Sequence, residues 1–244
     1  MFVTANGTCR ASTNVVELRQ QAKAVADRKV MRFLTGVELP PFVAATNLIV
    51  NRADVHRDDI GLYTVSGWEA KAPPIQGTYD GSEDVARALA EEFRNRVTPT
   101  DWLRDMGNNA LCQIAIATSV RGPNCHYVGD GATMQTVLGL AQQTLVEEAA
   151  RVVIAVAFDV NAGEDDLERD ERPATAVALA LEAGHGPSNQ ERVELDVDDG
   201  AHLHDVDAVT VLGAWLRAID SASERPAPVM CGDVQLGLVT LTAR

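Results

Sequence analysis

The sequence lacks any apolar run long enough to cross a membrane as a helix. Such a helix needs about 20 consecutive apolar residues, and no stretch of the chain approaches that length. The N-terminus, MFVTANGTCRAS, also lacks the basic flank and the apolar segment of a secretory signal. We therefore expect no membrane partner, no export and a cytoplasmic protein.

Basic residues are scarce relative to acidic ones. The chain has 21 Lys and Arg against 35 Asp and Glu, which gives a formal net charge of −14 at pH 7. A strongly acidic protein repels nucleic acid phosphates and anionic lipid surfaces unless basic residues are locally concentrated, and no such cluster occurs here. We therefore expect no nucleic acid partner.

Motifs for disulfides, metals and cofactors are also missing. The four cysteines include no C-x-x-C pair, so reduced thiols are expected; they are Cys9, Cys112, Cys125 and Cys231. The HLH motif at His202 and His204 has no third ligand in view. The acidic runs 161–172 and 194–200 lack the spacing of a calcium loop and are predicted to be solvated loops. We expect no metal and no cofactor.

The features that are present predict a layered α/β domain. Apolar runs at 151–158 and 174–182 have the length of strands covered on both faces, and 58–68 and 233–243 also read as strands. Helical patterns alternate with them. We predict two helices within 14–50, interrupted at Pro40-Pro41, and single helices at 82–97, 100–120, 132–149 and 206–221. With 244 residues the chain can bury its own core, and we predict a single domain, 1–244.

The segment RGPNCHYVGDGATM, residues 121–134, predicts a strand, a tight glycine turn and the start of a helix. Gly122-Pro123 ends the preceding helix, and Asp130 is the expected N-cap of the following one. Many enzymes hold a nucleophile at such a junction, yet the tip here reads Gly-Asp-Gly.

Several fragments, in unbroken order, resemble the N-terminal half of a β-ketoacyl synthase. They are RK..RF (28–33), DDIGLYTVSG (58–67), NNALCQIAIATSVRGPN (108–124), GDGAT (129–133), ARVVIAVAFDV (150–160) and ATAVALALE (174–182). The resemblance covers residues 28–183. It implies a thiolase-like layered α/β fold, truncated to roughly the N-terminal half plus a residual C-terminal helix and strand.

The resemblance also implies that this chain lacks the family's catalytic residues. In the family, the strand after Gly-Pro delivers a cysteine to a helix N-terminus, and the matching position here is Gly131. Cys125 lies six residues earlier, about 20 Å away along an extended strand, so it cannot substitute. The family's two histidines have no counterpart, because His185 imitates one of them but lies in the wrong place. We therefore expect no catalytic residue and no enzyme activity from the chain alone.

Relatives with a replaced cysteine are the chain length factors, which pair with an active ketosynthase and shape the tunnel in which the acyl chain grows. The resemblance therefore implies a non-catalytic subunit in type II polyketide, polyene or fatty-acid-like chain elongation, with an acyl carrier protein as an indirect partner. The family's dimer pairing implies an interface strand, and the residue after Ser66-Gly67 matches a position lining the acyl pocket. The interface candidates are Asn124, Cys125, His126, Tyr127 and Val128, and the tunnel candidate is Trp68.

Two other functions stay open at this point. The first is a stand-alone acyl-thioester decarboxylase or hydrolase, in which amide groups at the helix N-terminus near Gly131 would polarise the thioester carbonyl. The second is a purely structural stabiliser of a ketosynthase that does not touch the acyl chain.

Overall fold

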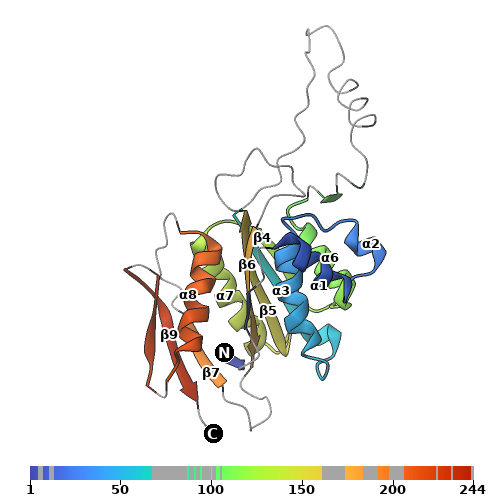
Figure 1. Cartoon of the computed structure of the whole chain (residues 1–244). Helices are drawn as coiled ribbons and strands as arrows, with labels where there is room; N and C mark the ends of the chain where they lie inside the picture. The colour runs from blue at the N-terminus through green and yellow to red at the C-terminus, as the bar shows by residue number, and fades with distance from the viewer. Residues whose placement is uncertain are drawn as a thin grey trace.

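The chain folds into four stacked layers of sheet and helix in a computed structural model (Figure 1). From one side to the other, the layers are the sheet segment of β7, β8 and β9, the helices α7 and α8, the sheet segment around β3, β5 and β6, and the helices α1, α2, α3 and α6. The structure describes residues 1–4, 8–10, 14–67, 87, 91, 94, 100, 103–104, 106–160, 174–183, 192–197, 206–223, 225–231 and 233–242.

Helices and strands alternate through most of the chain. The helices are α1 (Val15–Lys23), α2 (Arg28–Met31), α3 (Leu39–Val50), the short 3-10 helix η1 (Arg57–Asp59), α6 (Asn109–Thr118), α7 (Gly131–Val146) and α8 (Ala208–Asp220). The strands are β1 (Phe2–Thr4), β2 (Thr8–Arg10), β3 (Ile60–Ser66), β4 (Asn124–Val128), β5 (Val152–Val160), β6 (Ala174–Glu182), β7 (Arg192–Val197), β8 (Ala227–Cys231) and β9 (Val234–Thr242).

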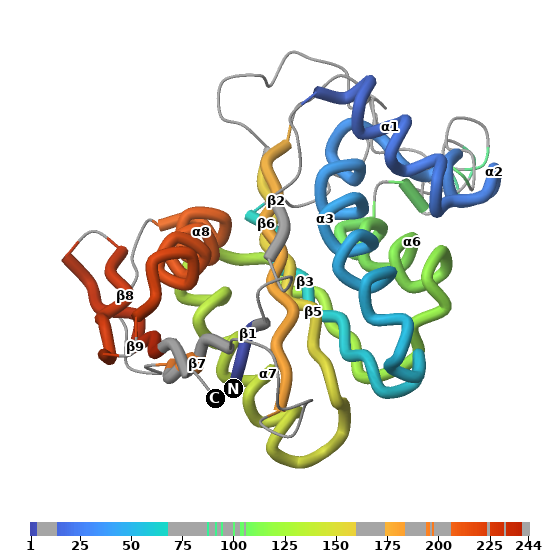
Figure 2. The backbone as a smooth tube through the Cα atoms, turned by 60° about the horizontal axis from the view of Figure 1, so that its bottom comes forward, coloured from blue at the N-terminus to red at the C-terminus, as the bar shows by residue number. Residues whose placement is uncertain are grey.

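All the described strands belong to one sheet in the order β4-β3-β5-β6-β1-β7-β9-β8, with β2 added beside β6. β3 pairs in parallel with both β4 and β5, whereas β5 and β6 are antiparallel from Val152↔Glu182 to Val160↔Ala174. β1 joins the two halves, since it pairs with β6 on one side and β7 on the other (Figure 2). As a result, β4 and β8 are the two end strands of the sheet.

The sheet segment around β5 is covered on both faces, as its continuous apolar sequence predicts. Val153, Ala155 and Ala157 of β5 face the core around α7 and α8. Ile154 and Val156 face the opposite core, against α3 and α6. The first core also contains Trp215, and a buried hydrogen-bonded chain crosses it. The indole of Trp215 donates to Gln135 Oε1 at 3.4 Å, and Gln135 Nε2 donates to the Leu236 carbonyl at 2.6 Å. These two bonds tie α8, α7 and β9 together.

The N-terminal helices differ from the prediction. Residues 14–50 form three helices rather than two, and Pro40 and Pro41 lie in the first turn of α3 instead of interrupting a helix. Proline fits there because the first amide groups of a helix have no partner within the helix, so nothing is lost by removing one.

The helix predicted over 100–120 is interrupted. Leu103 and Arg104 are helical, but 106–108 form a bend and turn, and α6 begins at Asn109. Gly107 and Asn108 are poor helix formers, which accounts for the break. The helix ends at Ser119, whose φ of 59° is left-handed, and not at Gly122-Pro123. Of the helix predicted over 82–97, the structure describes Arg87, Glu91 and Arg94, all of them helical.

The C-terminal part contains more strands than predicted. Helix α8 and strand β9 confirm the predictions for 206–221 and 233–243, but the acidic run 194–200 is not simply a solvated loop, because its first residues belong to β7. Strands β1, β2 and β8 were also missed. The acidic run 161–172 lies outside the described residues. None of the helices in the described part of the chain is long and apolar enough to cross a membrane.

Candidate functional site

The junction of β4 and α7, which we call the elbow, has the predicted strand, turn and helix. β4 ends at Val128, and α7 begins at Gly131. Asp130 is the N-cap between them, because its carboxylate accepts a hydrogen bond from the backbone N–H of Thr133 at 3.1 Å. The elbow is therefore retained as a well-formed strand-turn-helix unit.

The tip of the elbow has no room for a side chain. A Cβ atom on Gly131 would lie 2.5 Å from Cγ2 of Val211 and 2.8 Å from the carbonyl oxygen of Val206. The backbone N–H of Gly131 donates to that same carbonyl at 2.5 Å. The start of α8 and the residue before its N-cap thus fill the space that a side chain at position 131 would need.

A shallow hollow of about 470 Å³ lies beside the elbow and is acidic. Three carboxylates line it, those of Asp130, Asp159 and Asp207. Asp207 caps α8 as Asp130 caps α7, since it accepts from the backbone N–H of Thr210 at 2.7 Å. Among the described residues that line the hollow, there is no thiol, imidazole or amine. The hollow therefore offers no nucleophile suited to acyl transfer.

The described cysteines are poor nucleophiles. Burial raises the pKa of Cys125, on β4, to about 11, although its hydrogen bond with the Tyr127 side chain acts in the opposite direction. Burial also raises the pKa of the Cys112 and Cys231 thiols. Because the thiolate is the reactive form, a raised pKa makes each of these thiols less reactive near neutral pH than an ordinary cysteine.

His126, in the middle of β4, is held in a largely apolar site. Its Nδ1 atom forms a hydrogen bond with the hydroxyl of Thr64 at 2.8 Å, and its ring lies 6.3 Å from that of Phe158. Burial lowers the pKa of His126, so the imidazole is neutral near pH 7. Its Nε2 atom is buried and has no hydrogen-bond partner within the described structure.

Among the described strands, none pairs with the outer edge of β4, which we call its free edge. Two bonds at its ends, from Leu62 N to the Pro123 carbonyl and from Gly129 N to the Ser66 carbonyl, fix the parallel ladder with β3. In such a ladder alternate residues bond to the neighbouring strand. The backbone N–H and C=O groups that point away from β3 are therefore those of Asn124, His126 and Val128.

The two ends of the sheet differ in how they are protected. β8 carries Pro228 and a register shift between Val229 and Met230, and both features hinder pairing with a further strand. β4 has no proline, no Asp, Glu, Lys or Arg, and regular pairing along its length. Its last two residues are also exposed apolar side chains, Tyr127 at 39% and Val128 at 44%. Of the two end strands of the described sheet, β4 is therefore the one suited to strand addition.

Helix α6, which packs against α3 and against β3, the strand next to β4, exposes an apolar face. Its sequence NALCQIAIAT contains no charged residue. Ile116 is 64% exposed, and Cys112 and Ala115, on the same side of the helix, are half-buried. We call the free edge of β4 and this face of α6 the β4–α6 surface. An uncharged helix face with exposed apolar side chains is typical of an interface.

Comparison of the sequence with known protein families and curated proteins finds no match. Among solved structures, however, the chain is similar to a chain of "Ketosynthase (ApeO) in Complex with its Chain Length Factor (ApeC)" from Xenorhabdus doucetiae. The TM-score is 0.50 at 15% identity, and the match covers 98% of this chain and 99% of that one.

The chain has the ketosynthase fold. It is also similar to a chain of the structure "AntDE:AntF (apo): type II PKS acyl-carrier protein in complex with its ketosynthase bound to the hexaketide", with a TM-score of 0.52 and 12% identity, over 81% of this chain and 70% of that one. The predicted thiolase-like layered fold is thereby confirmed. The nearly complete coverage of both chains in the first match means that this short version of the ketosynthase fold has a counterpart of about the same length.

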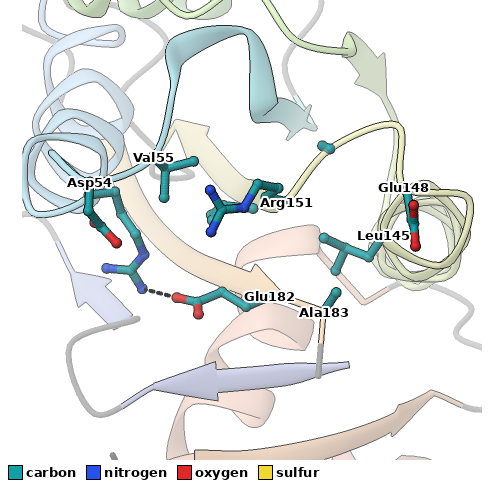
Figure 3. A pocket seen from close by; sticks show the side chains of 10 residues that line it. Asp54, Val55, Leu145, Glu148, Arg151, Glu182 and Ala183 are labelled. Carbon is teal, nitrogen blue, oxygen red and sulfur yellow. Dashed lines mark ion pairs between the residues drawn. The ribbon is translucent and has the colours of Figure 1, made fainter. Parts of the chain in front are cut away.

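A second cavity of this ketosynthase-fold chain, of about 330 Å³, lies at the end of β6 and is drawn in Figure 3. Its main feature is a buried ion pair, in which Arg52 Nη2 lies 3.0 Å from Glu182 Oε1. Arg151 also points into the cavity, with Asp54 and Glu148 at its margins (Figure 3). The mixture of opposite charges selects no single class of ligand, and we interpret the ion pair as structural.

Several residues singled out from the sequence lie outside the described residues. They are the tunnel candidate Trp68, the histidines His185, His202 and His204, and Cys9 with respect to its side chain. The five interface candidates all lie on β4. Within the described ranges, no group of three or more His, Cys, Asp or Glu side chains is placed to hold a metal ion. The plugging of the elbow by Val206 and Val211 was not predicted, because those residues come from a distant part of the sequence.

Proposed function

We propose that the chain is a non-catalytic subunit of the chain length factor type. It pairs with an active ketosynthase, as a heterodimer or a larger assembly, and shapes the tunnel in which the acyl chain grows. The reaction is chain elongation of the type II polyketide, polyene or fatty-acid-like kind. The acyl carrier protein delivers its cargo to the ketosynthase, so its contact with this chain is indirect.

The observation that carries the proposal is the plugged tip of the elbow. The backbone of the catalytic unit is kept, with its strand, its N-capped helix and its turn, but Val206 and Val211 take the space of a side chain at Gly131. A strand-turn-helix unit that is kept without its nucleophile is expected in a non-catalytic subunit that pairs with a catalytic one. It is not expected in an enzyme that acts alone.

The β4–α6 surface supports pairing with a second ketosynthase-fold chain. Its outward backbone groups, on Asn124, His126 and Val128, are suited to antiparallel or parallel strand addition, and the apolar face of α6 adds area beside them. The similar solved structure from Xenorhabdus doucetiae is a ketosynthase in complex with its chain length factor. We infer that a ketosynthase occupies the corresponding surface here.

The stand-alone thioester enzyme is less well supported. Its chemistry would need free amide donors at the start of α7, but the N–H of Gly131 already donates to Val206 and that of Thr133 to Asp130. The purely structural stabiliser differs from the proposed subunit only in whether the chain touches the acyl group. That difference is decided by the products of the complex.

Co-expression tests the pairing. The chain and the cysteine-bearing ketosynthase encoded nearest to it should elute together, with a mass by light scattering equal to a whole-number ratio of the two, most simply one to one. A purified chain that stays a well-behaved monomer in the presence of that ketosynthase would contradict the proposal.

The tunnel role is tested at Trp68, which matches the family's pocket-lining position. In the reconstituted complex, Trp68→Ala should lengthen or broaden the product distribution without stopping condensation, because a smaller side chain leaves a deeper tunnel. Product analysis by mass spectrometry gives the readout. An unchanged distribution would remove Trp68 from the tunnel and favour the structural stabiliser.

A further inference from the structure

The Nε2 atom of His126 is one of the few buried side-chain polar atoms of the described residues without a hydrogen bond. A buried polar atom without a hydrogen bond destabilises the folded state, so most such atoms in folded proteins have partners. Nε2 is fully shielded and has none within the described residues, although Nδ1 of the same ring is bonded to Thr64. The hydroxyl of Thr64 can donate to Nδ1, which would place the proton of the neutral ring on Nε2.

Gly107 lies close to Nε2 of His126. A Cβ atom on Gly107 would lie 3.4 Å from Nε2 of His126 and 3.9 Å from Cγ2 of Val128. Gly107 belongs to the turn that interrupts the predicted helix just before α6. Gly107 is itself partly exposed and has no side chain, so no Cβ atom packs against the imidazole at this point.

The surroundings of this glycine are apolar and exposed. Met106, next to it, is 40% exposed, Val128 is 44% exposed, and Leu103, one helical turn earlier, is 46% exposed. Isolated exposed apolar residues are common, but here Met106 and Val128 flank a glycine above a buried polar atom, at the edge of the β4–α6 surface. We call Met106, Gly107, Val128 and His126 the Gly107 site. An apolar lining with one polar atom is how proteins hold an amphiphilic chain.

We propose that the Gly107 site contacts the growing acyl chain, and that the Gly107 turn shifts in the complex so that Nε2 of His126 forms a hydrogen bond with an oxygen substituent of that chain. The inference rests on the proposed pairing with a ketosynthase, since the partner supplies the other wall. The inference assigns the substrate class. The acyl chain would still carry a keto or hydroxyl oxygen where it contacts the Gly107 site, rather than being a pure hydrocarbon. A hydrocarbon would leave Nε2 unsatisfied, whereas an oxygenated chain relieves that penalty.

The test uses the complex of this chain, labelled with ¹⁵N at its five histidines, and unlabelled ketosynthase. Two probes of equal length are compared, a β-ketoacyl and a saturated acyl thioester of N-acetylcysteamine. The Nε2 resonance of His126, assigned by its loss in His126→Phe, should shift with the β-ketoacyl probe and stay in place with the saturated one. A resonance that moves with neither probe, or equally with both, overturns the inference.

Two variants give a second readout in the same complex. His126→Phe keeps an aromatic ring but removes the nitrogen, so it should shift the products toward more reduced chains, or lower the preference for the β-ketoacyl probe several-fold. Gly107→Ala, which adds a methyl group over Nε2, should act in the same direction. Unchanged selectivity in both variants argues against the inference. If the wild-type chains form no complex, the proposed function itself fails. If they form a complex but the Nε2 resonance of His126 does not respond to the β-ketoacyl probe, only this inference fails.

Discussion

At the scale of single residues, Gly131 is the position where a replacement is informative. Gly131→Ala should lower the free energy of unfolding by about 1–3 kcal/mol, the usual effect of forcing atoms into a filled core. The reason is the contact of the added Cβ with Val211 and the Val206 carbonyl. Denaturant unfolding measures the change. Thr136→Ala, at an exposed position of the same helix, is the control and should change stability by less than about 0.5 kcal/mol.

Restoring the family's cysteine should not restore catalysis. Gly131→Cys is expected to destabilise the chain at least as much as the alanine variant. It should show no condensation in the absence of a ketosynthase, because no histidine is among the described residues that line the hollow beside the elbow. A stable variant that condenses acyl groups alone would show that the tip of the elbow can open.

Cys125 should resist alkylation. With a pKa of about 11, against an ordinary value of 9.0, its thiolate fraction near pH 8 is about one-hundredth of that of an unperturbed thiol. Peptide mapping after iodoacetamide treatment should therefore find Cys125 largely unmodified in the folded chain and modified in urea. The sign of the pH effect follows from the raised pKa: this contribution to stability is intact below pH 9 and is lost as the pH rises toward 11. Rapid modification of the native chain at pH 8 would contradict this assignment.

At the scale of elements, the two residues at the end of β4 form a matched pair. Their side chains are similarly exposed, but the N–H of Tyr127 points to β3 and that of Val128 to the free edge. Val128→Pro should leave the chain folded and abolish the complex. Tyr127→Pro should remove a ladder hydrogen bond and lower the free energy of unfolding by about 1–3 kcal/mol. Thermal melts and size-exclusion chromatography separate the two effects. Normal complex formation by Val128→Pro would mean that the partner lies elsewhere.

The ion pair of Arg52 and Glu182 joins the end of α3 to the end of β6. Glu182→Gln should lower the free energy of unfolding by about 3 kcal/mol, since it leaves a guanidinium group in a site where only 8% of the side chain is exposed. The exposed pair of Arg121 and Asp58, at 2.6 Å, provides the control. Asp58→Asn should change stability by about 0–1 kcal/mol. Equal effects of the two substitutions would argue against a structural role for the buried pair.

The elements that could be predicted from the sequence are those with long, continuous patterns. The apolar runs that became β5 and β6, and the helical spacing of α7 and α8, are properties of the local sequence. The short strands β1, β2 and β8 depend on partners far along the chain, so nothing local marks them. β7 did carry a signal, because Val193, Leu195 and Val197 alternate with acidic residues, but the density of charge obscured it.

At the scale of the whole molecule, the fold and the strand-turn-helix elbow could be predicted from the sequence, but the packing around the elbow could not. The spacing from Gly122-Pro123 matches Gly131 to the family's cysteine position, which stays a prediction. The plug by Val206 and Val211, the open edge of β4 and the buried nitrogen of His126 all depend on contacts between distant segments. Together these features describe a chain that keeps the ketosynthase fold, closes its own elbow and leaves one end of its sheet open.

The most direct test of this account is intact-protein mass spectrometry of the two purified chains, alone and mixed, after incubation with an acyl donor and an extender thioester. We predict that the acyl adduct appears on the ketosynthase only, that this chain gains no mass in any mixture, and that full-length product forms only when both chains are present. An acyl adduct on this chain, or turnover of either thioester by this chain alone, would contradict the account.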